Sequence, residues 1–132
     1  MTDSAPFRLA DIDLSTGSFE VVEWTAPPSP GGTVRPIAPL HVHYGDDEAW
    51  YVLSGALGFH FDGEQHTAGP GEIAVARAGM VHTYWNAADT ETRYLLIMTP
   101  RLRELIAAIH DPELRAGRSM VQLFADYNSA LV

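Results

Sequence analysis

Two histidines and a carboxylate lie close together in the sequence at spacings that suit a metal site. His41 and His43 are two residues apart, and Glu48 follows five residues after the second histidine. Side chains on a β-strand alternate between its two faces, so on a strand both histidines would point to the same side. A third histidine far downstream, His82, can supply a fourth ligand. We predict that these four residues hold one divalent metal ion.

The residue types limit which metal can bind. The chain contains no cysteine, which excludes disulfides, thiolate zinc sites and iron–sulfur clusters. Imidazole nitrogens with one carboxylate oxygen suit divalent iron, manganese, nickel, cobalt or zinc. Four protein ligands still leave open positions on a five- or six-coordinate metal, where a substrate or dioxygen could bind. Asp46 and Asp47 are alternative carboxylates, but we expect them to form a solvated turn.

Composition and charge narrow the possible partners. The 132 residues fit one domain, and 46% of them are apolar, enough to form a hydrophobic core. The net charge of −9 and the lack of a basic cluster argue against nucleic acid as a partner. No apolar run approaches the ~20 residues that span a bilayer. The N-terminal residues do not resemble a signal peptide, so we expect a cytoplasmic protein that acts on a small molecule and does not bind membranes.

Short stretches rich in β-branched and aromatic residues, separated by turn residues, fill most of the chain. The expected strands are residues 18–24, 40–43, 48–53, 56–61, 73–76, 81–86 and 92–98, with a possible edge strand at 7–13. Asp62-Gly63 is a hairpin turn signal because both residues tolerate positive φ. We expect residues 73–76 to be buried and residues 92–98 to be buried on both faces. Many short strands indicate an antiparallel sandwich or barrel.

The end of the chain changes to a helical period. Thr99-Pro100 is a typical helix start, and Asp111-Pro112 breaks the pattern that follows. Ser119 can cap a second helix, with an apolar stripe that runs as far as Leu131. We therefore divide the chain into a β-barrel with N-terminal strands, residues 1–98, and a helical extension, residues 99–132. We expect both helices to pack on the outside of the barrel; a lid over its mouth and a dimer interface are the alternatives.

The segments around His41 and His82 resemble the two signature motifs of the cupin superfamily. The first reads His41-x-His43, four residues, Glu48, six residues and then Gly55. The second reads Gly71, five residues, Arg77-x-Gly79, two residues, His82, three residues and then Asn86. Together they cover roughly residues 35–100.

The resemblance implies an all-β fold, an antiparallel β-barrel of jelly-roll topology, with the short C-terminal helices added to it. It also implies that His41, His43, Glu48 and His82 bind a metal in the barrel interior. Two positions depart from the motifs, since Arg35 replaces a glycine and Arg77 replaces a proline. Neither is a ligand position.

Four further residues are candidates for binding a substrate. Arg35 could bind an acidic group of a substrate through its positive charge, although an exposed arginine on an edge is the simpler interpretation. Tyr84 and Asn86 share a strand face with His82 and could line the cavity. Trp50 could stack on a substrate, but a position in the core is the simpler interpretation. His60, His66 and His110 lack ligand spacing, and we interpret them as bystanders.

Small cupins with this pattern are often similar to quercetin dioxygenase, and the resemblance suggests a metal-dependent oxygenase. Its substrate would be a small enol-bearing or aromatic compound, and Glu48 would be the catalytic group that takes up a proton. The alternatives are a non-oxidative cupin isomerase, cyclase, decarboxylase or lyase, and a cupin that binds a metal or ligand without turnover. Because open sheet edges benefit from being covered, we expect a homodimer.

Overall fold

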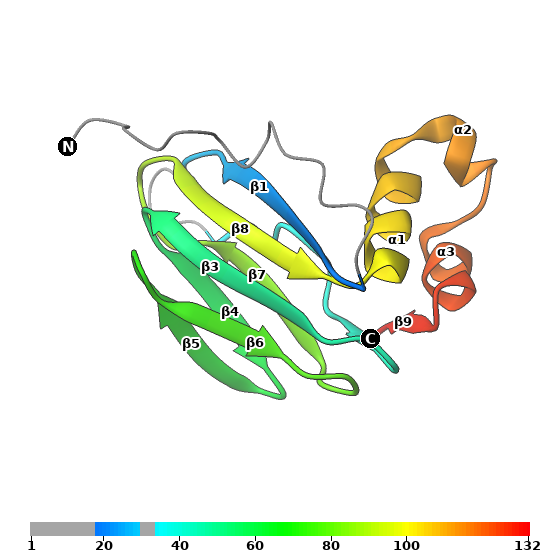
Figure 1. Ribbon diagram of the computed structural model, residues 1–132, viewed down its shortest axis with the longest axis horizontal. Coiled ribbons are helices and arrows are strands. Elements are labelled where there is room, and N and C mark those ends of the chain that lie inside the picture. The colour runs from blue at the N-terminus through cyan, green and yellow to red at the C-terminus, as the bar shows by residue number, and fades with distance from the viewer. Residues whose placement is uncertain (1–17, 30–33) are drawn as a thin grey trace.

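The computed structural model describes residues 18–29 and 34–132. Within these residues the chain forms nine β-strands and three helices, with the helices gathered at one end of the two sheets (Figure 1). The edge strand expected at residues 7–13 lies outside the described part of the chain. Every strand pair in the two sheets is antiparallel among the residues described, as the spacing of short strands predicted.

One sheet has four strands in the order β1-β8-β3-β6. Its strands are β1 (Glu20–Ala26), β8 (Thr92–Met98), β3 (Glu48–Ser54) and β6 (Ile73–Ala76). The short β6 lies at the edge, and Ile73 and Val75 on it are exposed, so the prediction of a buried strand here was wrong. In β8 only alternate residues are fully buried, so this strand buries one face rather than the two that we expected.

The second sheet has five strands in the order β5-β4-β7-β2-β9. Its strands are β5 (Glu64–Ala68), β4 (Leu57–Phe61), β7 (His82–Asn86), β2 (His41–His43) and β9 (Ser129–Leu131). Asp62 and Gly63 join β4 to β5 with φ values of 49° and 87°, which confirms the hairpin turn. The sequence did not predict β5, because four of its five residues are exposed and the segment is therefore polar.

The hydrophobic core lies between the two sheets. Trp50 of β3 and Phe59 of β4 come from opposite sheets and have ring centroids 5.2 Å apart. Both side chains are fully buried. In the described residues no strand pair joins one sheet to the other, so the sheets face each other without closing into a continuous barrel. The predicted all-β fold with short C-terminal helices is otherwise confirmed.

The C-terminal helices are α1 (Pro100–His110), α2 (Pro112–Arg115) and α3 (Met120–Asp126). The expected caps are present, since Thr99 accepts from the amide of Leu102 and Ser119 accepts from that of Gln122. Asp111-Pro112 ends α1 as predicted, but Asp111 also caps the short α2. None of the helices in the described residues is long and apolar enough to cross a membrane.

The second predicted helix ends earlier than its apolar stripe suggested. Asn128 adopts a φ of 55°, which stops the helix, and the chain continues as β9. Its register pairs Ser129 with His43 and Leu131 with His41. The last residues of the predicted helix therefore form an edge strand next to β2. For brevity, we call residues 100–131 the C-terminal cover.

Candidate metal centre

The four predicted ligands meet at one end of the sheets. His41 and His43 lie on β2, Glu48 begins β3 and His82 begins β7. The register pairs His41 directly with His82. All four side chains are buried, and one potential ligand atom from each lies within 4.8 Å of the others. The structure therefore brings together all four residues, which come from both sheets, as the motif spacing predicted.

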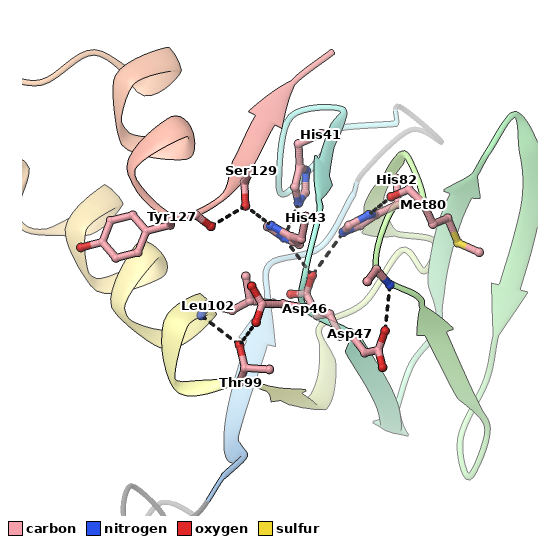
Figure 2. A network of polar contacts seen from close by, with 12 residues as sticks. His41, His43, Asp46, Asp47, Met80, His82, Thr99, Leu102, Tyr127 and Ser129 are labelled. Carbon is pink, nitrogen blue, oxygen red and sulfur yellow. Dashed lines mark hydrogen bonds and ion pairs between the residues drawn. The ribbon is translucent and has the colours of Figure 1, made fainter.

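The outer nitrogen of each histidine ring is bound to an oxygen. His41 Nδ1 contacts the carbonyl of Pro39, and His82 Nδ1 lies 2.9 Å from the carbonyl of Met80. A carbonyl only accepts, so both Nδ1 atoms must donate. His43 Nδ1 lies 2.7 Å from the Ser129 hydroxyl oxygen. These contacts orient the three rings so that Nε2 of each one faces the centre (Figure 2).

The Nε2 atoms of the three histidines and the carboxylate of Glu48 face one another as hydrogen-bond acceptors, with no donor between them. His41 Nε2 lies 3.1 Å from His43 Nε2, and His82 Nε2 lies 3.2 Å from a carboxylate oxygen of Glu48. When Nδ1 carries the proton of a neutral imidazole, Nε2 has only a lone pair to offer. Each contact then needs an added proton or a cation between its two atoms. Three imidazole nitrogens and one carboxylate oxygen are a donor set that suits a divalent transition metal, so the cluster could hold a metal ion.

Burial and neighbouring groups set the charges of this cluster. Burial lowers the pKa of His41 to about 4, and His82 adds to the effect, so the ring of His41 is neutral at physiological pH. Burial alone would raise the pKa of Glu48, but its contacts with His43 and His82 outweigh burial and lower it to about 2. The site thus offers a carboxylate and a neutral imidazole, the forms in which these groups bind metals.

A cavity of about 90 Å³ adjoins the cluster. His41, His43 and Glu48 form its polar end, and the remaining walls are mainly apolar. These walls consist of Trp24, Ile37, Ala38, Tyr84, Leu96, Leu102, Leu105, Ile106, His110 and Phe124. No arginine of the described residues lines the cavity, and the sequence has no lysine. The cavity is therefore suited to an apolar ligand that presents an oxygen to the cluster of histidines and Glu48.

The C-terminal cover forms one side of this cavity. Leu102, Leu105 and Ile106 of α1 line it together with Phe124 of α3. The Phe124 ring lies parallel to that of His43, with centroids 6.5 Å apart, and meets the ring of His41 edge-on at 5.4 Å. The expectation that both helices pack only on the outside was wrong, because α1 and α3 close the cavity over the cluster. This arrangement agrees with the lid over the barrel mouth, and a dimer interface formed by these helices stays a prediction.

Tyr84 and Tyr94 form a buried pair beside the cluster. Their hydroxyl oxygens are 2.9 Å apart, and Tyr84 also lines the cavity. Burial raises the pKa of Tyr84 well above its usual value, and it raises that of Tyr94 to about 12. Both hydroxyls therefore keep their protons at physiological pH. One hydroxyl donates to the other, which leaves one O–H hydrogen of the pair for a further acceptor.

The other candidate substrate residues lie away from the cavity. Arg35 is exposed and does not line it. Trp50 is fully buried in the core, although its ring lies 5.7 Å from that of His82. The Asn86 amide donates to the carbonyls of Pro27 and Thr90 and accepts from the Thr92 hydroxyl. This residue therefore fixes the ends of neighbouring strands.

Asp46 has a role that the sequence did not indicate. We expected a solvated turn residue, but its side chain is buried and accepts from the Thr99 hydroxyl at 2.9 Å. The guanidinium of Arg101 lies 3.2 Å from its other oxygen. Asp46 thus ties the ligand-bearing turn to the first turn of α1 (Figure 2). Asp47 is exposed, as expected, and accepts from the amide of Ala78.

The three histidines interpreted as bystanders differ in position. His60 and His66 lie on β4 and β5 and do not line the cavity. His110, at the end of α1, does line it, and its ring lies 5.7 Å from that of Trp24. Its exposure places it at the mouth of the cavity. The helical period alone gave no sign of this position, because it depends on how the C-terminal cover folds back.

A family model described as the cupin domain matches residues 30–98. A solved protein with a double-stranded β-helix domain from Klebsiella pneumoniae is 30% identical, covering 64% of this chain and 70% of that chain with a TM-score of 0.53. A sugar phosphate isomerase of the cupin superfamily from Silicibacter pomeroyi is 27% identical, covering 63% and 51% with a TM-score of 0.52. The matched region is thus about half of the isomerase chain.

A predicted oxalate decarboxylase from Thermotoga maritima is 24% identical, covering 60% of this chain and 64% of that chain with a TM-score of 0.51. At this identity the likeness shows the fold alone. No match was found among curated proteins.

Proposed function

This chain belongs to the cupin domain family, and from that premise we propose that it is a metal-dependent enzyme that oxygenates a small enol-bearing or aromatic compound. The observation that carries the proposal is the pairing of four buried ligands with an apolar cavity. A divalent metal held by His41, His43, Glu48 and His82 would supply a Lewis acid that polarises a substrate oxygen. Dioxygen is the oxidant, and both of its atoms enter the product.

The cavity walls limit the substrate. Apolar side chains favour a ligand with an apolar body, and the absence of arginine from the described lining leaves a phosphate or a second carboxylate without a counter-charge. A cavity of ~150 Å³ lined by apolar residues binds benzene, and this one measures about 90 Å³. We therefore infer a compound no larger than one ring, such as a short β-diketone. A larger substrate would require the C-terminal cover to move.

The residues around the cavity have distinct roles in this proposal. The carboxylate of Glu48 takes up the proton that the enol loses. With Tyr94 as the donor of the Tyr84–Tyr94 hydrogen bond, the Tyr84 hydroxyl donates its own hydrogen to the substrate oxygen. The apolar side chains of α1 and α3 hold the substrate body and exclude water, which strengthens both polar interactions. Arg35 has no role here, because its side chain is exposed and does not line the cavity.

The second candidate is a non-oxidative enzyme that uses the same metal and Glu48 to move a proton, as in an isomerase, cyclase or decarboxylase. The similarity to the Silicibacter pomeroyi protein, described as a sugar phosphate isomerase, favours it. The described cavity lining argues against a sugar phosphate as the substrate, because hydroxyls and a phosphate would find few polar partners there. Substrates of the proposed apolar class fit both candidate reactions.

Metal binding is tested first, by thermal unfolding of chelator-treated protein with and without added Fe²⁺, Mn²⁺, Ni²⁺, Co²⁺ or Zn²⁺. A metal at 100 times its Kd should add about 2.7 kcal/mol to the free energy of unfolding. His82→Ala should abolish this gain, whereas His66→Ala, which removes an exposed imidazole on β5, should preserve it. If no metal stabilises the wild-type protein, both candidate enzymes are wrong.

Oxygen uptake then separates the two candidates. Metal-loaded protein is assayed with a panel of small β-diketones and catechols in an oxygen-electrode cell. Consumption of dioxygen in proportion to substrate, abolished in His82→Ala and kept in His66→Ala, supports the oxygenase. Turnover that continues unchanged under nitrogen refutes the oxygenase and supports the non-oxidative enzyme. Tight substrate binding without turnover would indicate a binding protein instead.

A further inference from the structure

The Nδ1 atom of His43 contacts a side chain, that of Ser129. Among the described residues, the Nδ1 atoms of the other two candidate ligand histidines contact backbone carbonyls instead. Its hydroxyl oxygen lies 2.7 Å from His43 Nδ1, and the residue is 4% exposed. The same hydroxyl donates to the carbonyl of Tyr127 at 3.0 Å. With its hydrogen committed there, the oxygen can only accept from His43. This contact fixes which nitrogen of His43 carries the proton.

We propose that Ser129 is a positioning residue of the metal centre: it holds His43 as the tautomer protonated on Nδ1, with Nε2 free to bind the metal. The inference rests on the proposed metal site. Such partners of metal-bound histidines orient the ring and raise its basicity, and their loss typically costs 10- to 100-fold in metal affinity. His41 and His82 need no side chain for this purpose, because backbone carbonyls orient their rings.

The position of Ser129 also links the C-terminal cover to the centre. Three residues of β9 pair with β2, and the amide of Tyr44 donates to the carbonyl of Asn128 at 3.0 Å. Tyr127, whose carbonyl receives the Ser129 hydrogen, is the C-cap of α3. A chain of two hydrogen bonds therefore runs from the end of α3 to a ligand ring, as Figure 2 shows. Phe124 on the same helix packs on that ring.

The test replaces Ser129 with alanine and measures metal affinity by competition with a chromogenic chelator. Ser119→Ala is the matched control, because it makes the same chemical change in the C-terminal cover. It removes the cap of α3, which accepts from the amide of Gln122 and does not contact the metal cluster. We expect Ser129→Ala to lose 10- to 100-fold in affinity, whereas Ser119→Ala should lower thermal stability and leave affinity unchanged. Equal losses of affinity in both variants would overturn the proposal.

A second measurement needs no metal, and its wild-type arm does not depend on whether the variant folds. Long-range ¹H–¹⁵N spectra of the metal-free wild-type protein report which nitrogen of each imidazole carries the proton. We expect His43 to be protonated on Nδ1, and in folded Ser129→Ala we expect a mixture of tautomers. A wild-type His43 protonated on Nε2 alone would overturn the proposal. If the spectra agree with expectation but no metal binds, the proposed function fails while the assignment of Ser129 to His43 stands.

Discussion

The buried Tyr84–Tyr94 pair predicts a steep loss of stability in alkali. The pKa of Tyr94 is raised from 10.0 to about 12 in the folded protein. As the pH rises, the unfolded chain therefore loses this proton before the folded protein does. The contribution of Tyr94 to the free energy of unfolding is fully present below pH 10 and is lost as the pH rises from 10 to 12. A shift of two pKa units corresponds to about 2.7 kcal/mol. Tyr84, whose pKa is also raised, adds a loss of the same sign.

The sequence makes this measurement unusually clean. It contains no lysine and no cysteine, so tyrosines are the only side chains with ordinary pKa values near 10. Urea unfolding of chelator-treated protein, followed by tryptophan fluorescence, gives the free energy of unfolding at each pH. With both tyrosines protonated in the folded state, it should fall by about 2.7 kcal/mol per pH unit.

Tyr94→Phe should reduce that slope by about half, to about 1.4 kcal/mol per pH unit. Tyr44→Phe, which removes an exposed hydroxyl, is the matched control and should leave the slope unchanged. A wild-type protein whose stability does not change between pH 10 and 12, or a Tyr94→Phe slope equal to that of wild type, would refute the reasoning. Either result would mean that the tyrosine pair is not closed to solvent.

Two further substitutions test contacts that hold the elements of the fold together. Gly58→Ala should lower the free energy of unfolding by about 1–3 kcal/mol, because its new Cβ would lie 2.3 Å from the Trp85 indole nitrogen; an unchanged melting temperature would contradict this contact. Asp46→Ala should cost about 1–3 kcal/mol and increase hydrogen exchange at the start of α1, since it removes the acceptor of the Thr99 hydroxyl. Asp47→Ala, at an exposed position, is the control, and equal exchange in both variants would contradict the role of Asp46.

The convergence of the four candidate ligands was predictable from the sequence because it depends on local spacing. His41 and His43 share a strand face whatever the rest of the chain does, and Glu48 opens the next strand. His82 required the second motif, since only the pairing of β2 with β7 brings it opposite His41. The strand at 92–98 was predicted with its observed bounds, because its apolar residues are continuous and turn residues precede it.

The parts that were missed depend on long-range packing. The apolar stripe of the second helix continued through Leu131, and the sequence did not reveal that Asn128 would turn the chain into β9. The exposed β5 lacks the alternation of apolar and polar residues by which a strand is predicted from sequence. Asp46 has the sequence context of an ordinary acidic turn residue, because its partners Thr99 and Arg101 lie more than 50 positions away at the start of α1. Each of these errors concerns where the C-terminal cover or a sheet edge lies, which local periodicity does not determine.

The contact between Ser129 and His43 joins residues 86 positions apart. Closing a flexible loop of that length costs about 4 kcal/mol in chain entropy, plus a constant. During synthesis, His41, His43, Glu48 and His82 all leave the ribosome before Ser129 is made. The ring of His43 can be held by Ser129 only after β9 has emerged, later than all four residues of the cluster. A metal that binds the four residues before then would meet a His43 ring that Ser129 does not yet hold.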